Sequence, residues 1–360
     1  MAISTTPGHV PEMSFANLDP FNVSLQWALD RIPTYLFRLY APGSKGTTNL
    51  GEVTSAAWGK GCEGIESLLK IRVAELVNCH LWWKQHDADC RLMSWSSSLL
   101  FVFQFGFYLH QGGYGRHYKQ SLSDLRILVL DTRKFHKGTF IRDLELIEHF
   151  KESYSRPGEN DLPYMWKMRN GDAYYFGEYL TQGQLMIGGE CGHATMKRLV
   201  DQGLYKLCPA FRELKKGWAM PVVAMRKGIE YQTPAATTEA DVRMAIEAAA
   251  VFSGPRSKAG DGDARWIAAV APQLLSLQKR NYNDQEILSN FYLSSRLSGR
   301  TEALLDMECG IEGQGPTRLM VELEQAQSMA DAIRDYSRRS RREADDMLTE
   351  VWQEFLRMEI

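Results

Sequence analysis

Apolar residues recur along this chain with two spacings, one typical of strands and one typical of helices. Short runs of β-forming residues predict five strands in the first half of the sequence. They are residues 34–40 (TYLFRLY), 91–95, 125–131 (LRILVLD), 174–180 and 184–187. Spacing of three and four residues predicts helices before and between them. These are residues 24–31, 64–80, 96–109 and 141–151.

From about residue 199 onward the pattern becomes mainly helical. The predicted helices there are residues 239–252, 264–278, 284–297 and 316–357, with irregular connections at 253–263 and 298–315. Before the first helix, residues 1–23 are rich in Ser, Thr, Pro and Gly and predict a disordered leader. We therefore predict an α+β fold for residues 24–215, followed by a mostly α-helical C-terminal region at 216–360.

Composition and charge narrow the class of protein. The 360 residues are 44% hydrophobic and 24% charged, with a formal net charge of -2, so no global field attracts nucleic acid or an anionic membrane. The longest apolar run, residues 99–109, is about half the length that spans a bilayer. The N-terminus lacks a signal-peptide pattern, and the six cysteines lack zinc-ligand or disulfide-framework spacing. We expect no membrane association, no bound metal and an intracellular location, cytoplasmic or nuclear.

Three short segments carry candidate chemistry. LFRLY places Arg38 within a predicted strand, where a guanidinium needs an anionic partner such as a phosphate or a carboxylate. SWSSSL, residues 94–99, gathers hydroxyls and backbone N–H groups at a junction between strand and helix. FGEYLTQG places Glu178 beside a turn, where a carboxylate can stabilise positive charge that develops on a ribosyl carbon.

In this order the three segments resemble the signature of the cholera-toxin-type ADP-ribosyltransferase superfamily: Arg, then Ser-Thr-Ser, then Glu. The resemblance implies a split β-sheet core with flanking helices over residues 34–211, and NAD as substrate without a metal. Arg38, Ser94 and Ser96 would then bind NAD, with Ser94 also positioning the glutamate, and Glu178 would be the catalytic carboxylate. The reaction would be mono-ADP-ribosylation of a protein or nucleic-acid acceptor, or NAD hydrolysis. The same segments are also similar to uncharacterised proteins of filamentous fungi.

Two positions depart from the superfamily pattern. Phe176 stands two residues before Glu178, where arginine-modifying members carry Gln or Glu, so arginine is not the expected acceptor. Trp95 replaces the small central Thr of Ser-Thr-Ser, which favours the alternative of a non-catalytic interaction or regulatory protein built on a degenerate ADP-ribosyltransferase fold.

Structural interpretations of the same residues stay open. Arg38 can form an ion pair with Asp87 or Asp131, and the serines can act as helix caps. Glu190 is a second candidate for the catalytic carboxylate. The segment HLWWKQHDAD, residues 80–89, contains His and Asp residues, but their spacing does not match a known metal site.

Overall fold

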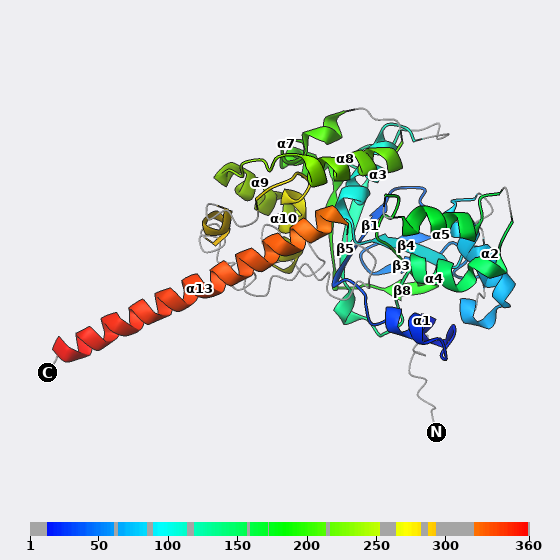
Figure 1. Ribbon diagram of the computed structural model, residues 1–360, viewed down its shortest axis with the longest axis horizontal. Coiled ribbons are helices and arrows are strands. Elements are labelled where there is room, and N and C mark those ends of the chain that lie inside the picture. The colour runs from blue at the N-terminus through cyan, green and yellow to red at the C-terminus, as the bar shows by residue number, and fades with distance from the viewer. Residues whose placement is uncertain are drawn as a thin grey trace, which may run out of the picture. The chain divides into compact units, whose positions relative to one another are not determined.

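The computed structural model describes most of the chain (Figure 1). The described residues are 13–60, 64–84, 89–113, 119–156, 159–171, 173–213, 217–252, 264–281, 287–292 and 320–358. They form a mixed α and β structure with antiparallel strand pairing and a helical C-terminal region, as the sequence predicts. No helix in these ranges combines the length and the apolar character that crossing a lipid bilayer requires.

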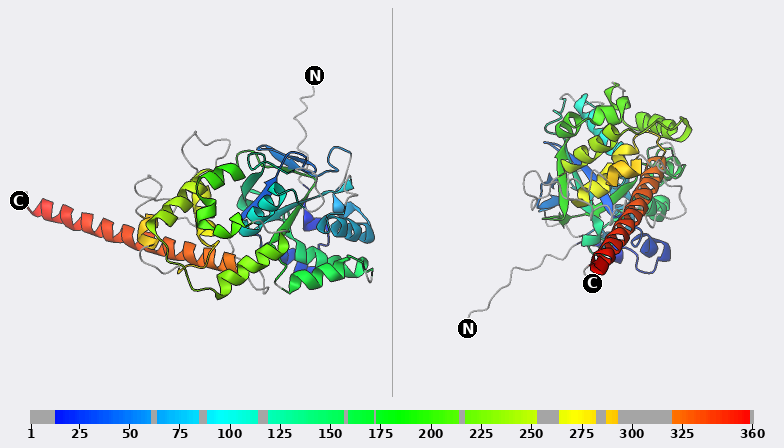
Figure 2. Two further views of the ribbon diagram at one scale, coloured as in Figure 1. Left: turned by 90° about the horizontal axis from the view of Figure 1, so that it is seen from above. Right: turned by 90° about the vertical axis from the view of Figure 1, so that its left-hand side faces the viewer.

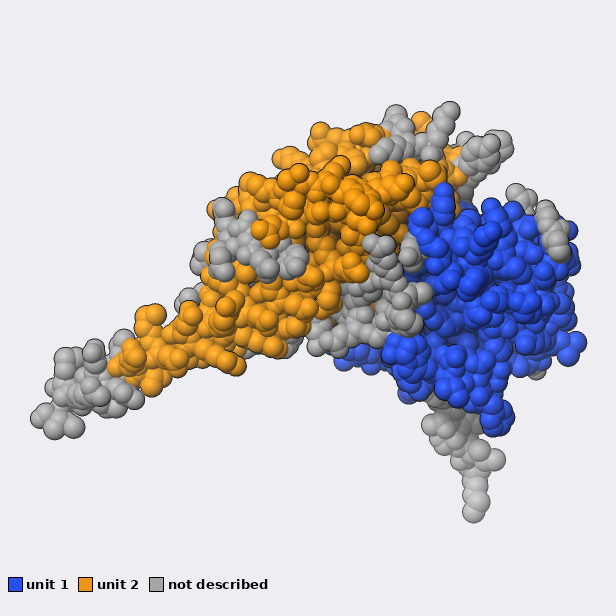
Figure 3. All heavy atoms as spheres, in the orientation of Figure 1, with its two compact units in different colours: residues 1–32, 43–95, 132–189 blue, residues 33–42, 96–131, 190–360 orange. Residues whose placement is uncertain are grey.

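The chain is organised as two compact units, each assembled from three segments (Figure 3). Unit 1 contains residues 1–32, 43–95 and 132–189, and unit 2 contains residues 33–42, 96–131 and 190–360. Strand β4 (Leu92–Ser96) therefore contributes its first four residues to unit 1 and Ser96 to unit 2. The linear division at residues 23 and 215 stays a prediction.

Unit 1 packs helices against short antiparallel strands. Its helices are α1 (Val23–Ala28), α2 (Lys70–Leu81), α4 (Asp143–Phe150) and α5 (Leu162–Asn170), with 3-10 turns η1 (Phe15–Asn17), η2 (Ile65–Ser67), η4 (Thr132–Lys134) and η5 (Lys151–Ser153). Strands β6 (Ile141–Arg142), β7 (Glu178–Gln182) and β4 are neighbours in that order, and β2 (Thr47–Thr48), β3 (Glu52–Thr54) and β8 (Gln184–Met186) form a second sheet.

The core of unit 1 lies between α2, α4, α5 and the strands. Val73 and Val77 of α2 meet Ile147 of α4 in one buried cluster, which also contains Leu92 of β4 and Leu180 of β7. Each such side chain contributes ~1.5–3 kcal/mol when it leaves water. This packing fixes the C-terminal end of α2 beside β4 and β7, where the polar residues described below are found.

Unit 2 contains a three-stranded antiparallel arrangement and most of the C-terminal helices. Strand β5 (Arg126–Asp131) pairs with β1 (Tyr35–Tyr40) on one side and β9 (Cys191–Thr195) on the other, so that Val129 faces both Phe37 and Gly192. A side chain at position 192 would collide with the indole of Trp266, so the close approach of that ring requires glycine. The helices are α3 (Leu99–His110), α6 (Met196–Asp201), α7 (Leu204–Leu207), η6 (Pro209–Arg212), α8 (Ala219–Tyr231), α9 (Glu239–Ala250), α10 (Ala264–Leu275) and α13 (Val321–Met358).

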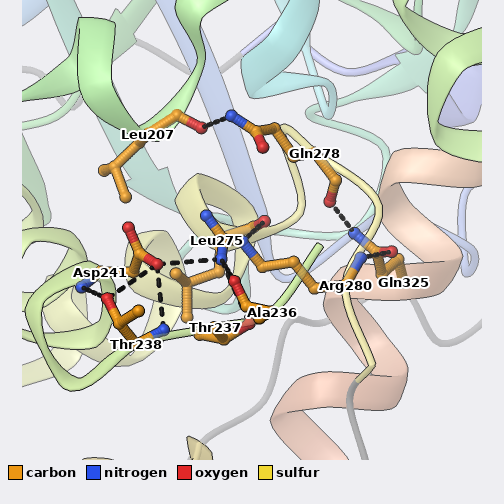
Figure 4. Close-up of polar contacts among 9 residues, drawn as sticks. All are labelled: Leu207, Ala236, Thr237, Thr238, Asp241, Leu275, Gln278, Arg280 and Gln325. Atoms are coloured by element: carbon orange, nitrogen blue, oxygen red, sulfur yellow. Dashed lines mark hydrogen bonds and ion pairs between the residues drawn. The ribbon is translucent and has the colours of Figure 1, made fainter. Parts of the chain in front are cut away.

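A buried polar network joins three helical segments of unit 2 (Figure 4). Arg280 follows α10 and donates to the hydroxyl of Thr237 at 3.1 Å and to Asp241 at 3.3 Å, next to the N-terminus of α9. The side chain of Gln325 in α13 accepts the backbone N–H of Arg280 at 2.9 Å and donates to the carbonyl of Gln278 at 2.7 Å. These bonds fasten the first turns of α13 to the unit. Beyond Ser337 the described side chains of this helix are mostly exposed, and the helix extends outward (Figure 2).

Most predicted elements are confirmed, with shifted boundaries. The predicted strand at 174–180 begins only at Glu178, and the predicted helix at 141–151 begins at Asp143 because β6 precedes it. The helix predicted at 64–80 begins at Lys70, after the η2 turn. Residues 1–12 of the predicted leader and much of the predicted helix at 284–297 lie outside the described residues.

The prediction of a disordered leader up to residue 23 is wrong for its last part. Phe15 is 0% exposed and belongs to the core of unit 1, and its backbone N–H donates to the carbonyl of Gly138 at 2.8 Å. One buried aromatic residue in a mostly polar segment gives no periodic signal, although burying its ring offsets the entropy lost when the segment is ordered.

Candidate functional site

His80 and Ser94 meet at the end of α2. His80 occupies the last turn of this helix, and its Nε2 lies 2.7 Å from Oγ of Ser94 in β4. Nδ1 of the same ring lies 3.1 Å from Sγ of Cys90. Both His80 and Ser94 are half-buried, whereas Cys90 is buried. The imidazole therefore bridges a thiol and a hydroxyl at a position that solvent reaches in part.

Glu178 joins this pair from the neighbouring strand. It is the first residue of β7 and follows Gly177, whose φ of 65° lies in the left-handed region that glycine adopts without strain. The Ser94 side chain hydrogen-bonds to the Glu178 carboxylate, and Arg169 of α5 donates to the same carboxylate at 2.7 Å. The Glu178 side chain is 14% exposed. The structure thus brings together Ser94 and Glu178, two of the residues predicted from the sequence.

Arg169 is shared between two carboxylates. Besides Glu178, its Nη1 contacts the carboxylate of Asp143, which is 0% exposed in the first turn of α4. The adjacent Arg142 is bound by Glu145, with Nε 2.7 Å from Oε2. Two carboxylates therefore share one guanidinium in this cluster.

Burial and the neighbouring charges shift the pKa values of the two acids in opposite directions. Burial alone would raise the pKa of Glu178, but the charge of Arg169, then that of His80, and hydrogen bonds from Ser94 and Arg169 hold it below its usual range. For Asp143, burial and the nearby negative charge of Glu178 outweigh Arg169 and raise the pKa to about 6. Glu178 is therefore ionised at neutral pH, and the inner acid titrates closer to neutrality.

Trp95 does not occupy the Ser94 side of β4. Successive side chains of a strand point to opposite faces. Trp95 is 2% exposed and its Nε1–H donates to Oγ1 of Thr181 in β7 at 2.9 Å, while its ring meets Phe140 edge to face. The large side chain of Trp95 thus packs on the opposite face of β4, and Ser94 lies beside Glu178.

Arg38 and Ser96, the other predicted NAD-binding residues, belong to unit 2. Arg38 lies on β1 opposite Leu128, and burial lowers the pKa of its guanidinium to about 10, so it stays charged at neutral pH. Asp131 pairs with Tyr35, so strand alternation puts it on the other face of the sheet from Arg38. Asp87, the other ion-pair partner considered for Arg38, lies outside the described residues.

Ser96 and Ser98 have the capping contacts that the structural interpretation predicts. Oγ of Ser96 accepts the Ser98 N–H at 3.0 Å, and Oγ of Ser98 accepts the Phe101 N–H at 3.2 Å at the start of α3. Ser98 also donates to Glu322 of α13 at 2.7 Å. Glu190, the rival acid, lies in unit 2 with its carboxylate 3.6 Å from Arg265.

Sequence reasoning missed the partners that complete the cluster. Asp143 and Arg169 stand in segments without a motif, because the contacts among α4, α5 and β7 arise only on folding. His80 was considered only as part of a metal-binding segment, of which His86 and Asp87 lie outside the described residues. Within the described ranges, no group of three or more His, Cys, Asp and Glu side chains is arranged to hold a metal ion.

The comparisons with known proteins identify one matching domain but no activity. Residues 31–183 match a domain of unknown function, DUF7587. No curated protein and no solved structure matches the chain. The matched span contains Arg38 and every member of the cluster around Glu178, and it ends directly after β7.

Proposed function

We propose that this protein cleaves the nicotinamide glycosidic bond of NAD, as a mono-ADP-ribosyltransferase or an NAD glycohydrolase. The observation that carries the proposal is Glu178, an ionised and partly exposed carboxylate that is oriented by a hydrogen bond from Ser94. This arrangement supports the Ser and Glu roles that the sequence resemblance implies. An ADP-ribosyltransferase-like split-sheet core is part of the same proposal.

For this reaction the protein has to position NAD and to place a negative charge beside the ribose. When the bond between ribose C1′ and the nicotinamide nitrogen breaks, its electron pair leaves with neutral nicotinamide and positive charge develops on the ribose. A fixed carboxylate stabilises this oxocarbenium-like transition state. The acceptor oxygen or nitrogen, or water, then bonds to C1′ and loses a proton. Glu178 supplies the carboxylate, and Arg169 and Ser94 fix its orientation.

The other NAD contacts in this proposal come from Arg38 and Ser96. A charged guanidinium on β1 suits a diphosphate, because Arg binds phosphate oxygens through paired hydrogen bonds. Phe176, two residues before Glu178, is buried and offers no polar group to an arginine acceptor. We propose a different protein acceptor, a nucleic-acid acceptor or water, and an intracellular site of action in the cytoplasm or nucleus.

One observation favours a second candidate, a non-catalytic interaction protein. Arg169 ties Asp143 of α4 and Glu178 of β7 to α5, and such a buried ion-pair network fixes geometry without any substrate. In that case the cluster is a structural element of a degenerate fold.

Nicotinamide release from NAD by the purified full-length chain separates the two candidates. Glu178→Gln keeps the size of the side chain but removes its charge and replaces one acceptor oxygen by an NH2 donor, and we expect about a hundredfold or greater loss of rate. Glu190→Gln is the matched control, since it makes the same change at the rival acid, and it should keep the wild-type rate. No nicotinamide release by wild type above the rate without protein would favour the non-catalytic candidate. Equal measurable rates for Glu178→Gln and wild type, with both folded by circular dichroism, would instead remove Glu178 from the catalytic role.

A further inference from the structure

The side chains of His80, Ser94 and Glu178 form a chain of hydrogen bonds. In this chain the position of one proton determines the direction of the next hydrogen bond. The Ser94 hydroxyl lies 2.7 Å from Nε2 of His80 and also hydrogen-bonds to Glu178. A hydroxyl has one proton, so Ser94 donates either to His80 or to Glu178. Only the second arrangement gives the carboxylate a donor at this point.

The protonation of His80 determines which arrangement forms. If Nε2 carries a proton, it donates to Ser94 Oγ, and the Ser94 proton is directed to Glu178. If Nε2 is bare, it accepts the Ser94 proton and Glu178 loses this hydrogen bond. Nε2 is protonated in imidazolium and in one neutral tautomer, and it is bare only in the other neutral tautomer.

Two neighbours favour the protonated Nε2. Sγ of Cys90 lies 3.1 Å from Nδ1, and a thiol that donates to Nδ1 leaves the single proton of neutral imidazole on Nε2. Sγ also lies 3.7 Å from the carbonyl of Leu92, a longer and weaker alternative for the thiol proton. On the other side, an ionised carboxylate is a stronger acceptor for the Ser94 hydroxyl than a neutral ring nitrogen.

We infer that His80 is a positioning residue, whose Nε2–H holds the Ser94 hydroxyl so that its proton points at Glu178. Its effect on catalysis rests on the proposed function, whereas the direction of the hydrogen bonds does not. His80 acts through Ser94 and need not touch NAD.

The direction of the hydrogen bond between His80 and Ser94 can be measured on the full-length wild-type chain. Long-range ¹H–¹⁵N NMR of histidine-labelled protein distinguishes a protonated from a bare ring nitrogen, and His80→Gln assigns the signal among the eight histidines. We expect Nε2 of His80 to carry a proton. A bare Nε2 would overturn the inference, and it would instead describe a serine whose proton is accepted by histidine.

Kinetics tests the consequence for Glu178. The amide N–H of His80→Gln can donate to Ser94, whereas His80→Phe fills similar space without a donor. We expect His80→Phe to lower kcat for nicotinamide release about tenfold with KM within about twofold, and His80→Gln to recover most of the loss. Wild-type kcat in His80→Phe would overturn the positioning role. Absence of nicotinamide release from wild type would end the proposed function, and the NMR result would still decide the hydrogen-bond direction.

Discussion

Ser94 and Ser98 lie in the same short segment, yet they hydrogen-bond to glutamates in very different surroundings. Ser94 meets Glu178 in unit 1, where the carboxylate is partly exposed and shares its arginine with a second acid. Ser98 meets Glu322 in unit 2, where the carboxylate is 4% exposed. The residue types are alike, so burial and charge balance distinguish a candidate reactive group from a structural one.

In unit 2 the charges of Glu322 and its partner Arg226 are balanced. Glu322 accepts hydrogen bonds from Arg226 of α8 at 2.7 to 3.0 Å, in addition to the bond from Ser98. One cation faces one carboxylate, and both are buried. This pairing leaves little capacity for a ligand and attaches the start of α13 to α3 and α8. In unit 1 Glu178 shares Arg169 with Asp143 and is partly exposed, which leaves its carboxylate able to contact a cation.

The largest effect should come from breaking the balanced pair. Arg226→Met removes the cation and leaves Glu322 buried without it, which we expect to lower the free energy of unfolding by ~3–5 kcal/mol in urea denaturation. Arg226→Met combined with Glu322→Leu should recover most of this loss, because neither charge remains. A double variant as unstable as the single one would show that packing, not charge, holds α13 in place.

The two serines provide a matched pair of substitutions. Ser98→Ala loses the cap of α3 and the bond to Glu322, so we expect a loss of about 1–3 kcal/mol in the free energy of unfolding and little change in nicotinamide release. Ser94→Ala should change stability by less than about 1 kcal/mol and lower kcat about tenfold, because Glu178 loses one orienting donor. The comparison fails if both variants affect only stability.

The predicted elements show what the sequence pattern encodes. Residues 125–131 and 34–40 are short runs rich in β-forming apolar residues, and both contain strands. Strand β9 was missed because CGHAT contains Gly, Ala and His, and its pairing with β5 depends on the neighbouring strand. Local pattern thus predicts elements that bury a full apolar face, and misses those formed by tertiary pairing.

The candidate site shows the same limit. Ser94 and Glu178 could be predicted because a short ordered signature connects them. Arg169 could not, because it lies in a helix of mixed polarity, and its role depends on the approach of α4 and β7. The interleaved units could not be predicted either, since no composition change marks the exchange within β4.

The raised pKa of buried Asp143 in unit 1 should make the free energy of unfolding depend on pH. Folding raises the pKa of Asp143 from 3.8 to about 6, so the folded state binds more protons than the unfolded state between these values. Its contribution is present below about pH 4 and is lost as the pH rises through about 6. The lowered pKa of Glu178 acts in the opposite direction and is lost as the pH falls.

Asp143→Asn isolates this contribution. The free energy of unfolding of wild type minus that of the variant should decrease by about 1–2 kcal/mol between pH 4 and pH 6.5, allowing for the coupling between the two acids. Urea titrations at several pH values measure it. A difference that stays constant or increases with pH would mean that Arg169 keeps Asp143 ionised throughout, and that the cluster is balanced like the one in unit 2.

An exposed ion pair on α2 should have the smallest effect on the free energy of unfolding. Arg72 and Glu75 form a salt bridge on the helix that carries His80, but their side chains are 65% and 37% exposed. Because water solvates both charges in the folded and unfolded states, Arg72→Gln should change the free energy of unfolding by less than about 0.5 kcal/mol. A loss comparable to that of Arg226→Met would show that charge pairing itself, rather than its burial, determines the energies compared here.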